Sequence, residues 1–158
     1  MDNLASLILQ KEEGYREAPY YCSEGYPTIG FGLKIGTKDA PLKQYTFTMP
    51  KEIAAKWLDV RSRQLYLELA KDPEIASPWR MCNEVREAVL VSMAYQLGLS
   101  GLRRFRKTLN HIERGEWTDA ANECLMSRWA DQTPERAERH SDLFESGDID
   151  EFREMYGR

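Results

Sequence analysis

The amino-acid sequence predicts an α+β protein that is mostly helical, in which one long helix joins a small β-sheet lobe to a helical lobe. Three observations lead to this fold class. The first residues are apolar at helical spacing, the stretch 18–34 has the composition of strands, and nearly all of the chain after residue 48 returns to helical spacing. Because only one stretch favours strands, the sheet should be small.

The first helix is predicted from the apolar residues between Leu4 and Ile8 and from the glycine that ends their pattern. Gly14 is typical of the position just after a helix, where the backbone turns into the left-handed region. We therefore expect a helix over about 3–12, with Glu13 at its carboxyl-terminal edge.

The strand-like stretch contains aromatic and β-branched residues on both sides of a turn. Its range is 18–34, and the turn is Ser-Glu-Gly at 23–25. This arrangement predicts a small twisted hairpin or meander. Residues 35–48 are polar and include Gly36 and Pro41, so we expect a loop with at most one helical turn.

A long helix is expected to begin at Pro50, because proline is tolerated in a first turn, and to end at Asp72-Pro73. Roughly 20 residues would span about 30 Å, enough to connect two lobes. Farther along, Asn83 caps the segment 84–97, which is apolar nearly all round and predicts a buried central helix. Shorter helices are expected over four further ranges: 102–113, 118–126, 134–145 and 149–156.

These elements predict one domain made of two lobes. The expected boundaries are 13–49 for the β lobe, 50–71 for the connecting helix, and 1–12 with 72–158 for the helical lobe. A chain of 158 residues can bury a core without disulfides. Its apolar fraction of 42% is ordinary for a soluble globular protein.

Charge and hydropathy disfavour two classes of partner. The net charge of −4 argues against a broad nucleic-acid-binding face. No stretch approaches the ~20 apolar residues of a membrane span, so no stable membrane association is expected. The basic run RRFRK at 103–107 leaves open a local site for an anionic ligand, with a solvated mixed-charge face as the alternative.

The three cysteines, Cys22, Cys82 and Cys124, are scattered and form no CxxC pair, which argues against a disulfide framework and a zinc site. The two histidines, His111 and His140, have no metal-binding spacing. We therefore expect neither a metal nor a cofactor. No basic segment precedes the short apolar run at the amino end, so we expect synthesis in the cytoplasm without a signal peptide.

Three residues near the amino end have the chemistry of a hydrolytic site. At the end of a helix, Glu13 feels a dipole that disfavours its charge, and Tyr20 or Tyr26 could desolvate it. A carboxyl group that keeps its proton near neutral pH can act as a general acid. Cys22 and Thr28 lie six residues apart across the turn and could hold a water molecule. These residues alone leave open a surface glutamate, a buried free cysteine and an ordinary strand threonine.

Four segments of the chain together resemble one family, the phage-type lysozymes, which include the T-even bacteriophage lysozyme and its endolysin relatives. The segments are EGYREAPYYCSEGYPTIGFG (13–32), VREAVLVSMAYQLGLSGLRRF (85–105), GEWTDAA (115–121) and SRWADQTPERAER (127–139). The family pattern is Glu, eight residues, Asp or Cys, five residues, Thr. Glu13, Cys22 and Thr28 match it position for position.

The resemblance implies a lysozyme-like fold and a muramidase that cleaves the β-1,4 bond between N-acetylmuramic acid and N-acetylglucosamine. In such an enzyme Glu13 would protonate the glycosidic oxygen. Cys22, usually Asp in the best-known member, would help to activate a water molecule that Thr28 holds. The family inverts at the anomeric carbon, needs no cofactor, and implies a monomer whose substrate is peptidoglycan.

The resemblance also implies supporting roles for further residues. It implies three pairs of charged residues, namely Arg136 with Glu13, Arg139 with Glu12, and Glu24 with Arg128. It implies substrate contacts at five positions, namely Gly32, Leu33, Tyr95, Gln96 and Thr108. Trp129 is expected in the core.

Three departures from the T-even enzyme qualify this comparison. Residues 33–51 are about ten fewer than in that enzyme, so one small helix of the sheet lobe should be missing. Leu33 stands where that enzyme has a histidine, so an ion pair is lost. This chain is acidic whereas that enzyme is basic, which puts tight adsorption to an anionic cell wall in doubt.

Two other functions remain open from the sequence. One is a non-catalytic peptidoglycan-binding or phage structural module that kept the fold. The other is a cysteine peptidase that uses Cys22 with His111 or His140, although no local peptidase signature supports it. For a lytic enzyme without a signal peptide, we expect action on the cell wall in the periplasm, after a phage-made lesion opens the membrane.

Overall fold

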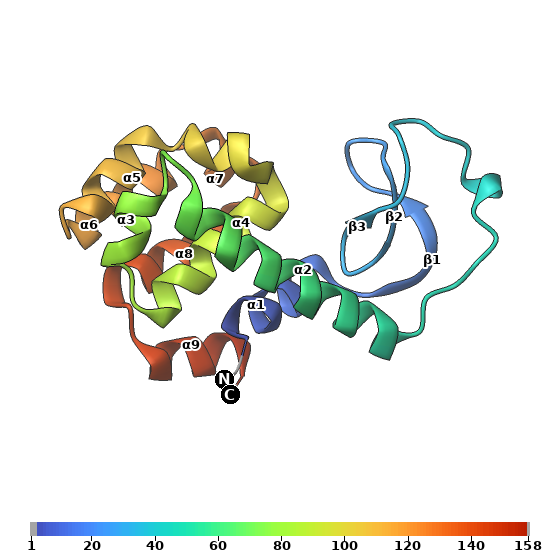
Figure 1. The fold of residues 1–158 in the computed structure, drawn as a ribbon, viewed down its shortest axis with the longest axis horizontal. Coiled ribbons are helices and arrows are strands. Elements are labelled where there is room, and N and C mark those ends of the chain that lie inside the picture. Colours follow the sequence, from blue (N-terminus) through green and yellow to red (C-terminus); the bar gives the residue numbers. More distant parts are fainter. Residues whose placement is uncertain (1–2, 158) are drawn as a thin grey trace. The chain divides into compact units, whose positions relative to one another are not determined.

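The computed structural model describes residues 3–157, and its elements confirm an α+β fold that is mostly helical (Figure 1). The strands are β1 (Arg16–Tyr21), β2 (Pro27–Gly30) and β3 (Leu33–Lys34). The helices are α1 (Leu4–Glu13), α2 (Lys51–Lys71), α3 (Ala76–Met81), α4 (Glu84–Arg103), α5 (Arg106–Glu113), α6 (Trp117–Leu125), α7 (Arg128–Gln132), α8 (Pro134–Ser146) and α9 (Ile149–Tyr156), with a 3-10 turn η1 (Leu42–Gln44). The helix at the amino end, the meander and the loop with one helical turn were all predicted.

The chain forms two compact units. The sheet unit is Leu9–Arg61, and the helical unit is Met1–Ile8 with Ser62–Arg158. Both α1 and α2 therefore contribute residues to each unit. The helices of residues 3–157 include none that is long and apolar enough to cross a bilayer.

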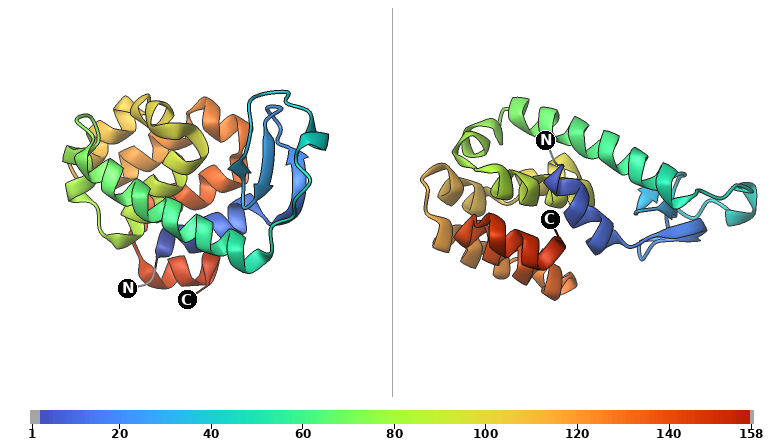
Figure 2. Two further views of the ribbon diagram at one scale, coloured as in Figure 1. Left: turned by 45° about the vertical axis from the view of Figure 1, so that its right-hand side comes forward. Right: turned by 90° about the horizontal axis from the view of Figure 1, so that it is seen from below.

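The sheet unit contains a three-stranded antiparallel sheet in the order β1-β2-β3. Tyr20 lies opposite Thr28 across the first pair of strands, and a register shift precedes Tyr20. The loop before α2 packs its η1 turn beside β1 (Figure 2). The Tyr21 hydroxyl donates to the carbonyl of Ala40 in this loop at 2.7 Å. The core of this unit is made of buried apolar residues from β2, the turn after it, the loop before α2 and α2 itself, namely Ile29, Phe31, Met49, Ala54 and Leu58.

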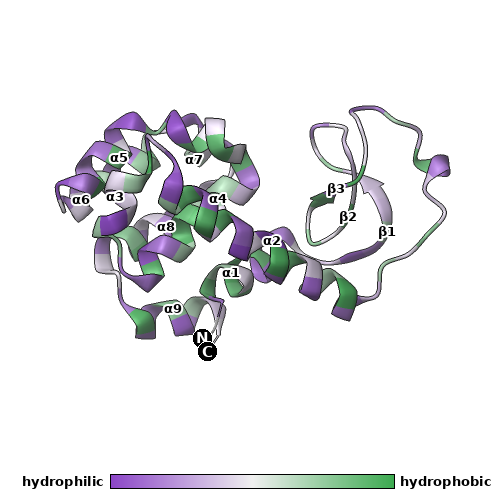
Figure 3. Ribbon diagram, viewed as in Figure 1, coloured by the Kyte–Doolittle hydropathy of each residue, from purple (hydrophilic) through white to green (hydrophobic). Residues whose placement is uncertain are grey.

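The helical unit is built around α4, as the sequence predicted. Its first half buries a continuous run of residues from Ala88 to Ala94. Most of these residues are hydrophobic, as the colours of Figure 3 show for much of this helix. By contrast, α5 and α6 bury only one side each, so polar and apolar residues alternate along them in the same view.

The structure corrects the expected helix boundaries after residue 97. The range of α4 contains two helices that meet at Gly98, whose φ of 77° and ψ of 166° are not helical, so the expected end at 97 agrees with the backbone. The second of them reaches Arg103, and α5 begins at Arg106 and not at 102. Glycine accepts this positive φ without strain, so the chain bends and resumes a helix within one residue. Two short helices, α3 and α7, lie outside the expected ranges. The side chain of Ser127 caps α7 by accepting from the backbone N–H of Ala130.

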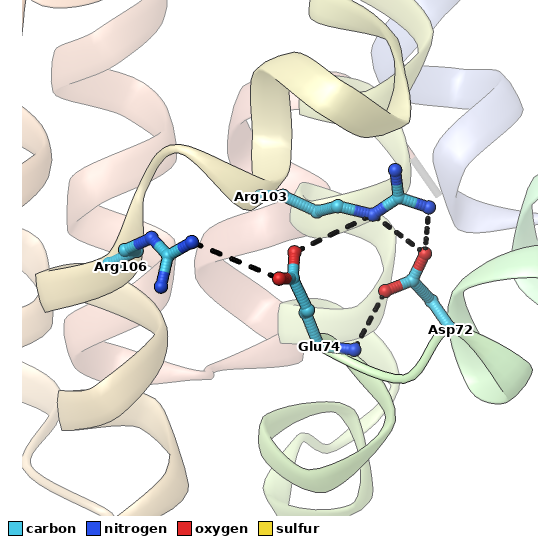
Figure 4. Close-up of polar contacts among 4 residues, drawn as sticks. All are labelled: Asp72, Glu74, Arg103 and Arg106. Atoms are coloured by element: carbon cyan, nitrogen blue, oxygen red, sulfur yellow. Dashed lines mark hydrogen bonds and ion pairs between the residues drawn. The ribbon is translucent and has the colours of Figure 1, made fainter.

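An ion pair between the buried Asp72 and the partly exposed Arg103 connects the segment after α2 to the end of α4 (Figure 4). Arg103 donates to a carboxylate oxygen of Asp72 through Nη2 and, at 3.0 Å, through Nε. The backbone N–H of Glu74 donates to the other oxygen at 2.9 Å. The hydrogen bond from Arg103 is the main reason why the pKa of Asp72 lies below its ordinary value.

We expect Arg103→Gln to lower the melting temperature by several degrees at pH 7. A carboxyl group with a lowered pKa stabilises the fold above its unfolded pKa of about 3.9, and loses this effect as pH falls through the folded pKa. The difference from the parent should therefore persist from pH 7 to 5 and shrink below about pH 4. Arg106→Gln is the matched control, because Arg106 is 79% exposed and only approaches Glu74 at 3.9 Å. Equal melting curves for parent and Arg103→Gln would contradict this role.

Candidate active site

Glu13 is the last residue of α1, as predicted, and its carboxylate lies against the backbone of Gly32. Gly14 has a φ of +67° and turns the chain from the helix into β1. Gly32, between β2 and β3, has a φ of +70°, and a Cβ atom placed there would lie 2.7 Å from Oε2 of Glu13. Only a glycine leaves room for the carboxylate in this position. The sequence predicted Gly32 as a substrate contact and did not reveal this packing against Glu13.

We expect Gly32→Ala to lower both stability and activity. The left-handed backbone alone should cost roughly 1–2 kcal/mol for a residue with a Cβ atom. The added methyl group must also displace the Glu13 carboxylate, and a misplaced catalytic group can cost about 10²-fold in rate. The control is Gly14→Ala, which has nearly the same φ and meets no atom within 4 Å. Equal activity of the two purified variants would contradict the proposed contact.

The environment of Cys22 favours its thiolate. Partial burial would raise the pKa of the Cys22 thiol, but the net effect of its surroundings is to lower it. The groups that lower this pKa are the backbone hydrogen bonds from Tyr26 and Glu24, the hydroxyl of Thr28 and the positive charge of Lys34. A thiolate is thus more populated at neutral pH than in an ordinary cysteine.

Thr28 is buried in β2 and connects the thiol to the turn. Its hydroxyl donates to the carbonyl of Tyr26 at 2.7 Å, and it also lies within hydrogen-bonding reach of Cys22. Because a hydroxyl carries one proton, it can donate either to the carbonyl or to the sulfur. Donation to the sulfur suits the thiolate, and donation to the carbonyl leaves an oxygen lone pair for a thiol proton. Thr28 can therefore adapt to both protonation states of Cys22.

The pKa of Tyr20 is affected by the charges of both Glu13 and Cys22. Burial raises the pKa of Tyr20, and the negative charges of Glu13 and Cys22 raise it further. The guanidinium of Arg16 lies 4.4 Å from the centre of the Tyr20 ring and opposes this shift. The sheet unit therefore brings the predicted acid and the predicted water-binding thiol to the same tyrosine.

The remaining predicted residues of the sheet unit lie on β3 and in the turn. Leu33 is half-buried in β3 and pairs with Ile29 across the sheet. Glu24 is exposed, and its carboxylate lies 3.8 Å from the ammonium of Lys34. Its expected pair with Arg128, which belongs to the other unit, stays a prediction.

Arg136 is buried in the helical unit. Its Nη2 donates to Oγ of Ser92 at 2.9 Å and to the carbonyl of Ser92 at 3.3 Å. The same Oγ lies 2.8 Å from Nε2 of His140. Since the serine oxygen accepts from Arg136, its own proton can go to His140, which then carries its ring proton on Nδ1. The expected pairs of Arg136 with Glu13 and of Arg139 with Glu12 stay predictions.

The position of His140 argues against a cysteine peptidase. The structure buries His140 completely and hydrogen-bonds it to Ser92. A catalytic base must reach the substrate. His140 instead packs against the ring of Trp129, with the two ring centres 5.8 Å apart.

Trp129 lies in the core, as predicted, with 4% of its surface exposed. Sequence reasoning missed its second role. The indole Nε1 donates to Oε1 of Gln96 at 2.9 Å, so the amide oxygen of Gln96 is engaged and its NH₂ group is left to donate elsewhere. Tyr95, its neighbour on α4, is half-buried. Contacts of both residues with substrate stay predictions.

Thr108 is more buried than its predicted contact with sugar requires. Only 3% of its surface is exposed, and the thiol of Cys124 lies 3.8 Å from its hydroxyl. Thr108 is one of the residues that line a pocket in the helical unit.

Within residues 3–157, one group of side chains has the composition of a cation site, although the sequence predicted none. Ligand atoms of His111, Glu116 and Asp119 lie within 4.8 Å of one another. Glu116 also lies 3.6 Å from the guanidinium of Arg114. The positive charge of Arg114 would oppose the binding of a cation to this group. That the protein needs no metal stays a prediction.

A three-stranded antiparallel sheet, a long helix and a helical unit with a buried central helix define the lysozyme-like class of α+β folds. Comparison with known protein families is more specific. The family described as phage lysozyme matches residues 10–139 of this chain, and the protein belongs to that family.

Known relatives span nearly the whole chain. Probable T4-type lysozyme 1 and probable T4-type lysozyme 2 of Dictyostelium discoideum are 24% and 28% identical to it, and each alignment covers 92% of this chain and 96% of the relative. The pre-baseplate central spike protein Gp5 of Enterobacteria phage T4 is 24% identical over 92% of this chain, which corresponds to 28% of that protein.

Proposed function

We propose that this protein is a muramidase that hydrolyses the β-1,4 bond between N-acetylmuramic acid and N-acetylglucosamine in peptidoglycan. Membership of the phage lysozyme family supports a peptidoglycan hydrolase. The observation that carries the proposal is the packing of the Glu13 carboxylate on Gly32, in the same unit as a cysteine whose pKa is lowered. An acid and an anionic water-binding group are the two parts that an inverting glycosidase needs.

In the proposed reaction, Glu13 donates its proton to the glycosidic oxygen as the bond to the anomeric carbon breaks. A water molecule attacks that carbon from the opposite face, and its oxygen forms the new bond. Cys22 and Thr28 would hold this water molecule, and the thiolate would accept its proton. The product would have the inverted configuration, because no bond forms between sugar and protein.

The helical unit would bind the rest of the glycan. Tyr95 and Gln96 follow the buried part of α4, and the hydrogen bond from Trp129 holds the amide of Gln96 in one orientation. A fixed amide is suited to recognising the acetamido groups of the substrate. Gly32 and Leu33 would contact the glycan from the sheet unit.

A second function, a structural module of a phage particle, is favoured by one observation. The relative named as a central spike protein matches 92% of this chain with only 28% of its own length. Such a module would need the fold and not the acid. The adjacent Cys22 and Thr28, with the pKa of the thiol lowered, favour the enzyme.

Mass spectrometry of muropeptides after digestion of purified peptidoglycan tests the proposal. Hydrolysis should leave reducing-end muramic acid, and a lytic transglycosylase would leave an anhydro end. No cleavage by folded protein would support the structural module. In the cell, the proposed enzyme would lyse a bacterial host by acting on the periplasmic wall once the membrane has been opened.

A further inference from the structure

The helical unit contains a pocket of about 600 Å³ between the end of α4, the start of α5 and the α6–α7 region. Four cationic side chains line it, and Glu123 is its acidic one. The cations are Arg104, Arg106, Lys107 and Arg128. The whole chain has a net charge of −4, so the positive charge around this pocket is opposite in sign to that of the protein as a whole.

The cations of the pocket are little neutralised by their own unit. Arg106 is 79% exposed and approaches Glu74 at 3.9 Å, as Figure 4 shows. Arg104 and Lys107 are exposed, and within the helical unit as far as residue 157 no carboxylate forms an ion pair with either. An anion that enters the pocket could therefore form ion pairs with these cationic side chains.

The start of α5 adds a second, independent feature. The N-cap residue, Phe105, provides no side-chain acceptor, and the first turn contains no acidic residue. Instead Arg106 and Lys107 occupy that turn, where the positive end of the helix dipole disfavours cations. A sequence that breaks a local stability rule in this way is expected at a functional site. A bound anion would remove the conflict, because it would accept from the free N–H groups and neutralise both side chains.

The chemistry of the pocket indicates the kind of anion. Arginine guanidinium groups and a helix start are both suited to the oxygen atoms of a phosphate, which carries more charge than one carboxylate. Apolar walls accompany the cations, namely Leu97, Phe105 and Met126, and Met126 is 70% exposed. We propose that this pocket binds a phosphate-bearing group, with the apolar walls contacting the organic part of the ligand.

If the proposed muramidase function holds, this site would give an acidic enzyme a local attachment to phosphate-bearing components of the cell envelope. The binding itself does not depend on that function. It can be measured without an activity assay, so its failure and the failure of the muramidase are distinguishable.

The test is a titration of ¹⁵N-labelled protein with inorganic phosphate, followed by NMR at low ionic strength. Amide signals of residues 106–108 should shift and saturate. In the double variant Arg104→Gln/Lys107→Gln, affinity should fall about tenfold or more, since hydrogen bonds to charged groups are lost. A charge-matched control, Arg80→Gln/Lys43→Gln, removes two exposed cations elsewhere and should bind like the parent. Without phosphate, the first variant should melt close to the parent, because loss of Lys107 relieves a cation at the start of α5 while loss of Arg104 removes a favourable one at the C-cap of α4.

Three results would overturn the proposal: no saturable shift at residues 106–108, equal affinity of the two double variants, or acetate binding as tightly as phosphate. Glucose 1-phosphate and vesicles containing phosphatidylglycerol then identify the source of the phosphate. If the protein binds both glucose 1-phosphate and the vesicles, and the double variant binds neither, the ligand is a lipid headgroup. If the protein binds only glucose 1-phosphate, and the double variant does not, the ligand is a soluble or polymeric sugar phosphate.

Discussion

Glu13→Gln is expected to leave the protein folded and to lower its clearing of permeabilised Gram-negative cells by 10²–10⁴-fold or more, the usual effect of losing a general acid. The amide has the shape of the carboxyl group but cannot donate an acidic proton to the glycosidic oxygen. Packing should change little, because the amide occupies the same space beside Gly32. The measurement is the initial rate of turbidity loss per mole of folded protein.

The control for this experiment is Glu17→Gln, which removes an exposed carboxylate from β1 and should keep full activity. Circular dichroism and the melting temperature should agree among the three proteins. If Glu13→Gln clears cells within tenfold of the parent rate, Glu13 is not the acid. The activity would then depend on another acid, and the proposed roles of Glu13 and its neighbours would be wrong.

Replacement of Cys22 should have the second largest effect, and its direction should depend on the new residue. Cys22→Ala removes the group that holds water and accepts its proton, and we expect a loss of about 10²-fold or more. Cys22→Asp supplies a carboxylate at the same position and should stay active. A charge about 4 Å from a developing cation is worth roughly 4 kcal/mol at an effective dielectric constant of 20, before screening.

The pH dependence of the rate distinguishes these variants. The pKa of Cys22 is lowered in the fold, so the thiolate persists to lower pH than an ordinary thiolate and is lost as pH falls through that pKa. An aspartate has an unperturbed pKa of about 3.9, so the acidic limb of the Cys22→Asp profile should lie at lower pH than that of the parent. Identical acidic limbs would show that Cys22 does not titrate in the reaction.

The anomer released first tests the role of the sulfur. Proton NMR should show inversion, because the proposed thiolate activates water and does not bond to the sugar. A retained β-anomer, or a sugar adduct trapped on Cys22, would make the sulfur a nucleophile. Alkylation of Cys22 should block activity by filling the space for water.

Arg136 illustrates how the structure changes an expectation. The resemblance implied a pair of Arg136 with Glu13, and an ion pair between exposed side chains contributes little to folding. Its side chain is 7% exposed and hydrogen-bonded to Ser92, which in turn contacts His140. Removal of Arg136 would take a donor away from the buried Ser92, so stability depends on it whatever its role in catalysis.

The sequence by itself determined the fold class and the positions of most elements. The pattern Leu4–Ile8 with Gly14 predicted α1, and the residues around 23–25 predicted the meander. Such signals are local, because helix caps, turns and apolar spacing depend on neighbours within a few residues. The spacing of Glu13, Cys22 and Thr28 identified the candidate site only through resemblance to a family.

Only the tertiary structure decided how those residues are held. The backbone of Gly32 comes against Glu13, the amides of the turn and Lys34 lower the pKa of Cys22, and Gly98 separates the two helical parts of α4. These features arise where segments separated in the sequence pack together, and a local pattern carries no record of that packing. For the same reason, the basic run at 103–107 acquires a pocket only when α4, α5 and α7 enclose it.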